Sequence, residues 1–398
     1  MDYKIFFRKY ITTILFLVML FTFSYKTLVN SYSPIKESIN FQSSLKENIK
    51  SVETAMKENV YGRYGFIEAY GYMQRLMNKD EVSNFEVVKD KNDFLHYSYF
   101  ATGPNETDFL VSRMKSLKES IKNPDTKLAY IMTPDKYIKG YTEFKSGMPY
   151  SYANETADNF LYGLKENHID YLDLRENIKS SGIPMDKLFF KTDHHWTIET
   201  SFWGFQQIVR FINNNFQVNL DPENFYTDKE NYNSLEYKGV YLGSMGRKTG
   251  LAYDGLDDFT IIYPKFDTSY IFQYTDGENY TLQGNFEDAL FSAHAFRRED
   301  DLYNADKYFA YLKGNYPFGH IINTKNSEGP KALFVKDSMM VPPISFLSSM
   351  FSEIYIVDPR YYMEDIPALI NSLPLDFVFV SFYPQNLVDE FFPFFKEK

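Results

Sequence analysis

The sequence predicts an α/β fold in which a mostly parallel sheet is covered by helices on both of its faces. Short, nearly continuous apolar runs recur along the chain, as is typical of strands buried on both sides. Segments with helical spacing of apolar residues alternate with these runs, which is the order expected of βαβ units. With 398 residues, 44% of them hydrophobic, the chain is long enough to bury the large core that such a sheet needs.

The apolar runs and the segments between them give the order of elements. We expect strands at residues 128–133, 169–174, 332–335, 353–357 and 377–382. We expect helices at residues 51–77, 154–166, 197–213 and 344–350. Residues 215 to about 330 break this alternation, and residues 260–282 resemble a hairpin with Asp276-Gly277 at its turn. This part therefore predicts an antiparallel insertion or lid.

The N-terminus has the pattern of an export signal. Residues 10–25 carry no charge, while Lys4, Arg8 and Lys9 precede them and Lys26 follows. No small-residue cleavage site follows, so we predict an uncleaved signal anchor at residues 1–29. Positive-inside logic places its N-terminus in the cytoplasm and the rest of the chain outside. We predict a helical stalk and linker at residues 30–90 and one α/β domain at residues 91–398.

Composition excludes several kinds of function. The net charge of -11 argues against a nucleic-acid partner, because phosphate binding needs a basic surface. The chain has no cysteine, which rules out disulfides, cysteine-ligated zinc, iron–sulfur clusters and thiol nucleophiles. We expect no metal and no cofactor.

The run Asp193-His194-His195-Trp196 contains a carboxylate two residues before an imidazole. Such a carboxylate can accept the ring N–H and fix the tautomer, which is the role of the acid in a nucleophilic triad. The run follows the strand-like residues 188–190 and precedes a helix. In a parallel sheet this is the carboxyl edge, where catalytic groups collect.

Ser338 follows the strand predicted at residues 332–335 and precedes a helix. A serine on such a tight turn presents its hydroxyl, and the helix N-terminus offers backbone N–H groups to an oxyanion. Asp337-Ser338 by itself is equally typical of a helix cap. Together with the Asp-His-His-Trp run it indicates a nucleophile.

The two motifs resemble the DHHW protein family, which is related to the alginate O-acetyltransferase-like branch of the SGNH hydrolases. The matching pieces lie in family order at residues 192–197, 243–246, 336–338 and 358–362, and the resemblance extends from about residue 55 onward. It implies an SGNH-hydrolase-like three-layer α/β/α fold. It also implies that Ser338 is the nucleophile, His195 the base and Asp193 the acid. The chain order Asp, His, Ser departs from ordinary SGNH hydrolases but is shared by the acetyltransferase branch.

Five further residues are candidates for supporting the triad or binding an oxyanion: His194, Asp337, Asn315, Arg360 and Asn386. His194 is also typical of a core position, and Arg360 of a brace within its loop. Asn386 and Asn315 could donate to an oxyanion or a sugar, or simply cap turns.

Three functions follow from these observations. The first is an O-acetyltransferase or esterase acting on a cell-surface polysaccharide, with the acyl group supplied through a membrane-bound O-acyltransferase, a partner that only the resemblance implies. The second is a non-catalytic carbohydrate-binding or assembly protein of the cell envelope. The third is a metal-dependent phosphoesterase, which the letters Asp-His-His suggest but which needs further Asp-rich motifs that the sequence does not offer.

Overall fold

The computed structural model describes residues 3–40, 44–297 and 302–395. The chain forms two compact units, Met1–Met73 and Gln74–Lys398.

The first unit is helical. Its helix α1 (Tyr3–Ser38) contains one segment, Phe7–Ser38, that is long and apolar enough to cross a membrane. Helix α2 (Leu45–Glu58) begins at a capping box, in which Ser44 and Glu47 satisfy each other's backbone N–H groups. Helix α3 (Arg63–Leu76) follows, and most of it belongs to this unit. The single helical stretch predicted at residues 51–77 is therefore two helices, and the break comes at residues 59–62, where Gly62 has a φ of +72°.

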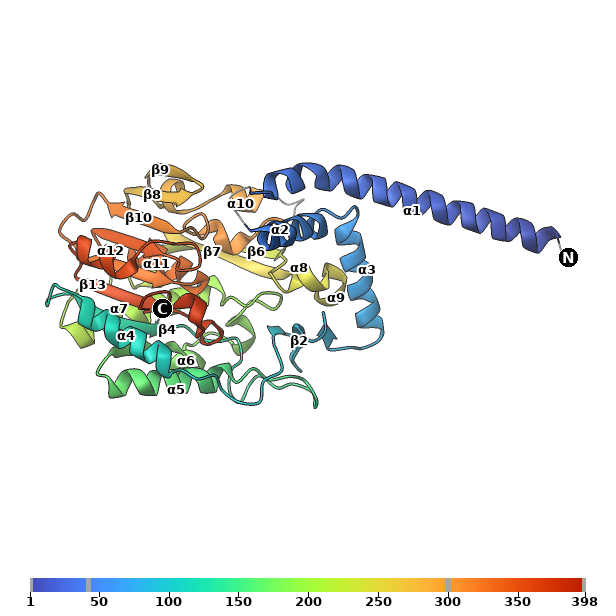
Figure 1. Cartoon of the computed structure of the whole chain (residues 1–398). Helices are drawn as coiled ribbons and strands as arrows, with labels where there is room; N and C mark the ends of the chain where they lie inside the picture. The colour runs from blue at the N-terminus through green and yellow to red at the C-terminus, as the bar shows by residue number, and fades with distance from the viewer. Residues whose placement is uncertain (1–2, 41–43, 298–301, 396–398) are drawn as a thin grey trace. The chain divides into compact units, whose positions relative to one another are not determined.

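The second unit is built on an eight-stranded sheet with the order β5-β4-β13-β11-β12-β10-β8-β9. Figure 1 labels β4, β13, β10, β8 and β9 of this sheet. The first five strands of this order are parallel to one another. They are the five strands that the sequence predicts: β4 (Lys127–Met132), β5 (Asp170–Asp173), β11 (Lys331–Lys336), β12 (Glu353–Val357) and β13 (Phe377–Ser381).

Helices cover both faces of this sheet. On β11, Ala332 and Phe334 belong to one buried cluster, whereas Leu333 and Val335 belong to the other, as the alternation of side chains along a strand requires. The first cluster includes α7 (Ile198–Phe216) and α11 (Val341–Leu347). The second includes α4 (Asp108–Ser120), α5 (Ala153–Glu166) and α12 (Ile366–Ser372). The predicted three-layer α/β/α arrangement is confirmed.

The antiparallel part extends the same sheet. Strands β10 (Phe318–Asn323), β8 (Tyr270–Asp276) and β9 (Glu278–Gly284) pair antiparallel beyond β12. The predicted turn at Asp276-Gly277 is confirmed, with Gly277 at a φ of +69°. The predicted start of the hairpin is wrong, because β7 (Asp257–Pro264) pairs instead with β6 (Tyr232–Tyr241) in a separate two-stranded sheet. Pro264 ends β7, since proline cannot donate to a further ladder bond.

Short elements complete the unit. A small sheet of β1 (Glu81–Val82), β2 (Val87–Lys89) and β3 (Leu95–Tyr97) precedes α4, and its strands are too short to show a period in the sequence. The short helices are α6 (Leu174–Asn177), α8 (Gly246–Thr249), α9 (Leu251–Asp254) and α10 (His294–Arg297). The strand predicted at residues 188–190 is wrong: Phe189 pairs only with Trp196, in an isolated bridge.

Candidate active site

A loop that closes on itself presents Asp193 and His195. The Phe190 N–H donates to the His195 carbonyl at 3.2 Å, and the Thr197 N–H donates to the Leu188 carbonyl at 3.0 Å. These bonds pair residues 188–190 with the other end of the same loop rather than with the main sheet. The apolar side chains of residues 188–190 are buried in the first hydrophobic cluster, where Phe190 packs on Tyr241 and Phe259, although the run forms no strand of the main sheet.

Two buried side chains anchor the loop from behind. Asp257 accepts from the backbone N–H groups of Lys191 and Thr192, at 2.6 and 2.8 Å, and from the Thr192 hydroxyl at 2.6 Å. Lys136 donates to the carbonyl oxygens of Lys191 and Asp193, at 2.8 Å each. Burial lowers the pKa of Lys136 to about 8. The backbone on both sides of Asp193 is thus held by side chains from other segments.

Ser338 reaches the site from β11. It opens a single 3-10 turn, Ser338–Met340, that leads into α11. The Asp337 carboxylate caps this turn by accepting from the Met339 N–H at 2.9 Å. Ser338 is thereby fixed at the carboxyl end of a central parallel strand, where ligands and catalytic groups gather in open α/β sheets.

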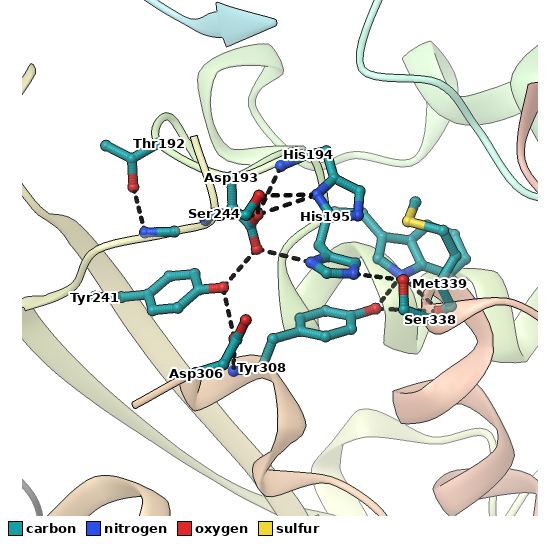
Figure 2. Close-up of polar contacts among 12 residues, drawn as sticks. Thr192, Asp193, His194, His195, Tyr241, Ser244, Asp306, Tyr308, Ser338 and Met339 are labelled. Carbon is teal, nitrogen blue, oxygen red and sulfur yellow. Dashed lines mark hydrogen bonds and ion pairs between the residues drawn. The ribbon is translucent and has the colours of Figure 1, made fainter. Parts of the chain in front are cut away.

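Ser338, His195 and Asp193 form one continuous hydrogen-bonded line (Figure 2). His195 Nε2 lies 2.8 Å from Ser338 Oγ, across 143 residues of sequence, and His195 Nδ1 lies 2.7 Å from Asp193 Oδ2. Asp193 is fully buried, and Ser338 is 6% exposed. Because the carboxylate can only accept, Nδ1 carries the proton and Nε2 is free to accept from the Ser338 hydroxyl.

Asp193 is surrounded by donors. Its Oδ2 also accepts from the Tyr241 hydroxyl at 2.5 Å, and its Oδ1 accepts from the hydroxyl and the N–H of Ser244 and from the His194 N–H. Burial by itself would raise the pKa of Asp193. The imidazoles of His195 and His194 outweigh it and hold that pKa well below its usual range. Asp193 therefore stays ionised.

His195 is held between two rings. The Tyr308 ring stacks on one side at a centroid distance of 3.8 Å and an angle of 12°, and the His194 ring also lies 3.8 Å away, tilted by 37°. The Tyr308 hydroxyl and the Trp196 indole N–H both donate to the Met339 carbonyl at 3.1 Å. These contacts tie the imidazole of His195 to the turn that carries Ser338.

Several residues of the site were not predicted from the sequence. Tyr241, at the end of β6, contacts Asp193 and also lies 3.0 Å from Asp306. Asp306 in turn pairs with Arg247 at 2.8 Å. Tyr308 was also missed. None of these residues stands in a motif, and the one signal nearby was the weak Gly-Ser pattern at residues 243–246.

The five supporting candidates separate into two groups. His194 contacts the triad: its Nδ1 lies 3.1 Å from Ser244 Oγ and 3.2 Å from Asp193 Oδ1, and burial, followed by the neighbouring His195, lowers its pKa. The others brace the ends of β11 and β12. Arg360 makes a two-bond pair with Asp358, Asn315 accepts from Lys336, and Asn386 donates to Asp337. Burial raises the pKa of Asp337.

Asp193, His194 and His195 are also grouped closely enough to ligate a metal ion, with one ligand atom from each residue within 4.8 Å of the others. Both Asp193 oxygens are directed at hydrogen-bond donors, and His195 Nε2 is directed at Ser338. A cation would have to replace these bonds. The geometry therefore fits proton transfer better than metal ligation.

The chain can be compared with known proteins on this basis. Residues 97–260 match the family model described as the SGNH hydrolase-like domain of the acetyltransferase AlgX. None of the curated proteins matches the chain.

Solved structures with the same fold include three that cover more than three quarters of the chain. PatB1 of Bacillus cereus with a sulfonyl adduct has a TM-score of 0.64 at 20% identity, covering 78% of this chain and 98% of its own. A second PatB1 structure has a TM-score of 0.60 at 21% identity, covering 77% and 99%. A DHHW family protein from Eubacterium siraeum has a TM-score of 0.60 at 16% identity, covering 80% and 99%. The predicted resemblance is confirmed: residues 97–260 match the model of the SGNH hydrolase-like domain of the acetyltransferase AlgX, and the second unit has the fold of these solved structures.

Proposed function

We propose that the protein transfers acyl groups outside the cytoplasm, as an O-acetyltransferase or esterase of a cell-surface polysaccharide. The observation that carries this proposal is the unbroken hydrogen-bonded line from Ser338 through His195 to Asp193. A serine so placed has its base within reach and the base has its orienting acid, which is what nucleophilic catalysis requires.

The reaction follows from this geometry in two steps. Ser338 Oγ attacks the carbonyl carbon of an acyl ester while His195 Nε2 takes the hydroxyl proton. The ester C–O bond then breaks, the leaving alcohol takes that proton from His195, and the acyl group remains on Ser338. In the second step His195 removes a proton from a sugar hydroxyl or from water while that oxygen attacks the acyl carbon. The bond between this carbon and Ser338 Oγ then breaks, and His195 returns the proton to Ser338. Asp193 stays ionised and orients the His195 ring in both steps.

Covalent labelling of the proposed nucleophile, Ser338, tests the proposal. PatB1, which shares the fold, has been captured with a sulfonyl adduct. A sulfonyl fluoride should likewise label this protein once, at Ser338, because only an activated serine reacts readily. Peptide mass spectrometry locates the label. Absence of any label at Ser338 would favour the non-catalytic carbohydrate-binding alternative.

We expect the rate to decrease on the acid side of the pH–rate profile through the uptake of a single proton. A general base that already holds a proton cannot accept one from Ser338, so the rate should decrease on the acid side. Asp193 should not add a second proton to this decrease, because the neighbouring imidazoles hold its pKa well below its usual range, and burial lowers the pKa of His194. Hydrolysis of p-nitrophenyl acetate across the acid range should therefore fall with a slope of one. A slope of two, or a slope that changes in His194→Gln, would contradict this assignment.

The membrane placement is part of the same proposal. Lys4, Arg8 and Lys9 precede the uncharged run at residues 10–25, which favours a cytoplasmic N-terminus and an α/β unit outside. Protease added to cells with a permeable outer layer should digest a C-terminal tag and spare an N-terminal one. If the protease digested the N-terminal tag and spared the C-terminal one, the proposed topology would be wrong. With the α/β unit outside, the acyl donor would come through a membrane-bound O-acyltransferase partner.

A further inference from the structure

Helix α3 presents an exposed apolar face. Phe66, Tyr70 and Met73 follow one another at helical spacing and are 59%, 45% and 58% exposed. These three residues are called the α3 face below, and the small residue between them, Ala69, is exposed as well. On the opposite side of the helix Gly71 is buried. A run of large apolar side chains left uncovered on one side of a helix marks a surface that binds protein or lipid.

Helix α1 provides the reference for depth in a membrane. Its uncharged run at residues 10–25 is bounded by Lys9 and Lys26. The rise between these two lysines is about 26 Å at 1.5 Å per residue. This length is close to the hydrocarbon thickness of a bilayer, about 30 Å. If α1 crosses a bilayer, as proposed, Lys9 and Lys26 mark its two surfaces.

Contacts within the first unit place the start of α3 at the level of Lys26. The Lys26 ammonium group donates to the Tyr61 hydroxyl at 2.9 Å, and the Tyr61 N–H donates to the Thr27 hydroxyl at 3.2 Å. The Phe66 ring meets the Phe23 ring edge to face, with centroids 5.8 Å apart. Because Phe23 lies inside the uncharged run, Phe66 points to the membrane side of Lys26. The rest of the α3 face lies on the same side of the helix as Phe66.

The direction of α3 keeps this face near one depth. Residues 7–22 of α1 are all exposed, so α3 does not run back along the apolar run. Figure 1 shows α3 running across the direction of α1. A helix that crosses a membrane-spanning helix at the level of the bilayer surface lies in the plane of that surface. The 14 residues of α3 would then lie along about 21 Å of it.

We propose that α3 lies on the outer surface of the bilayer, with the α3 face inserted among the lipid headgroups and the first part of the acyl chains. Aromatic rings are enriched at this level of a membrane, and helices that lie there bury an apolar face. Lipid is the occupant, rather than a protein, because the face begins at the end of the apolar run of α1 and is directed to its membrane side. The proposal rests on the proposed membrane crossing of α1 and does not depend on acyl transfer.

The consequence concerns the α/β unit. The boundary between the two units falls within α3, after Met73, so no flexible linker separates them. A helix fixed to the lipid surface would therefore hold the second unit at that surface instead of raising it on a stalk. Substrates attached to the membrane would then be favoured over substrates far from it.

Spin labelling of the full-length protein in vesicles of phosphatidylcholine and phosphatidylglycerol tests the proposal. The chain has no cysteine, so each single-cysteine variant carries one nitroxide at a known position. Collisions with oxygen, which concentrates in lipid, are compared with collisions with a water-soluble nickel chelate. We expect oxygen to dominate at Tyr70→Cys and Met73→Cys. Val18→Cys, in the apolar run, is the lipid control, and Tyr162→Cys, at a 66% exposed position of α5, is the water control.

A charge on the α3 face should release it from the lipid. In the Tyr70→Cys protein, adding Met73→Glu should make collisions with nickel dominate, because a carboxylate is costly among acyl chains. Met73→Leu keeps the face apolar and should leave oxygen dominant. Since the Met73 side chain is exposed, neither change should lower the thermal stability measured in detergent.

The possible outcomes distinguish this proposal from the others. Dominant nickel collisions at Tyr70 and Met73, with oxygen dominant at Val18, would overturn the placement of α3 and keep the membrane crossing. Nickel dominant at Val18 as well would overturn both. Labels that meet water in pure lipid vesicles but are shielded in native membranes would assign the α3 face to a protein partner instead. No change in the Met73→Glu protein would show that the face does not hold α3 in lipid.

Discussion

Replacing Ser338 by alanine is expected to lower acetate release from p-nitrophenyl acetate by at least about a thousandfold. In the proposed mechanism, the substitution removes the only atom of the triad that bonds to the acyl carbon. His195→Ala removes the base 2.8 Å away and should cost a similar factor. The double variant should be no slower than either single one, because the two groups act as one unit. Initial rates with the purified full-length protein measure all three.

Ser372→Ala is the matched control. Ser372 lies at the exposed end of α12 and donates to the Leu369 carbonyl, so its loss should leave the rate unchanged. If the wild type hydrolyses several acyl esters no faster than Ser338→Ala, the catalytic proposal fails. If the effects of Ser338→Ala and His195→Ala multiply, the two residues do not act in one step.

Gly243→Ala is expected to disable the site without touching any group that reacts. A Cβ atom on Gly243 would lie 2.2 Å from the Asp193 Cβ and 2.7 Å from the Asp193 N and Cα. These are backbone or near-backbone atoms, so the loop that carries Asp193 must shift. A displacement of about 1 Å in a catalytic group lowers a rate by about a hundredfold. The overpacking should also reduce the free energy of unfolding by about 1–3 kcal/mol.

Gly103→Ala is its control, since a Cβ there meets nothing within 4 Å. Rates on p-nitrophenyl acetate and thermal unfolding are compared for both variants. Wild-type activity in Gly243→Ala would show that the position of Asp193 is not critical, and the assignment of Asp193 as the orienting acid would have to be abandoned.

Much of the fold could be predicted because its signals are local. The runs at β4, β11 and β13 are apolar on both sides of the strand, and each is bounded by polar or turn residues, so burial on both faces can be read directly. The residues of the candidate triad could also be predicted from the sequence. Asp193 and His195 stand two residues apart, and Ser338 follows a recognisable strand. The uncharged apolar run at residues 10–25, which lies within α1, could be recognised from composition and length.

Other features depend on contacts between distant segments. The apolar run at residues 188–190 resembles a strand, but its backbone pairs with Trp196 of its own loop, and its side chains are buried against distant segments that include Tyr241 and Phe259. Tyr274 and its neighbours in β8 have no local sign that they extend the main sheet through β10. In both cases the partner segment, rather than the run itself, decides the structure.

The sequence by itself determined which residue types serve the site: a carboxylate beside an imidazole, and a serine after a buried strand. Only the tertiary structure decided what holds them in place. Tyr241 reaches Asp193 across 48 residues, and the Tyr308 ring lies against His195 from a segment 113 positions away. Gly243 is required because another backbone passes within contact distance of it. A local sequence pattern reflects only the structural preferences of residues that are close together in the chain. These contacts join distant segments and form only when the chain packs into its tertiary structure.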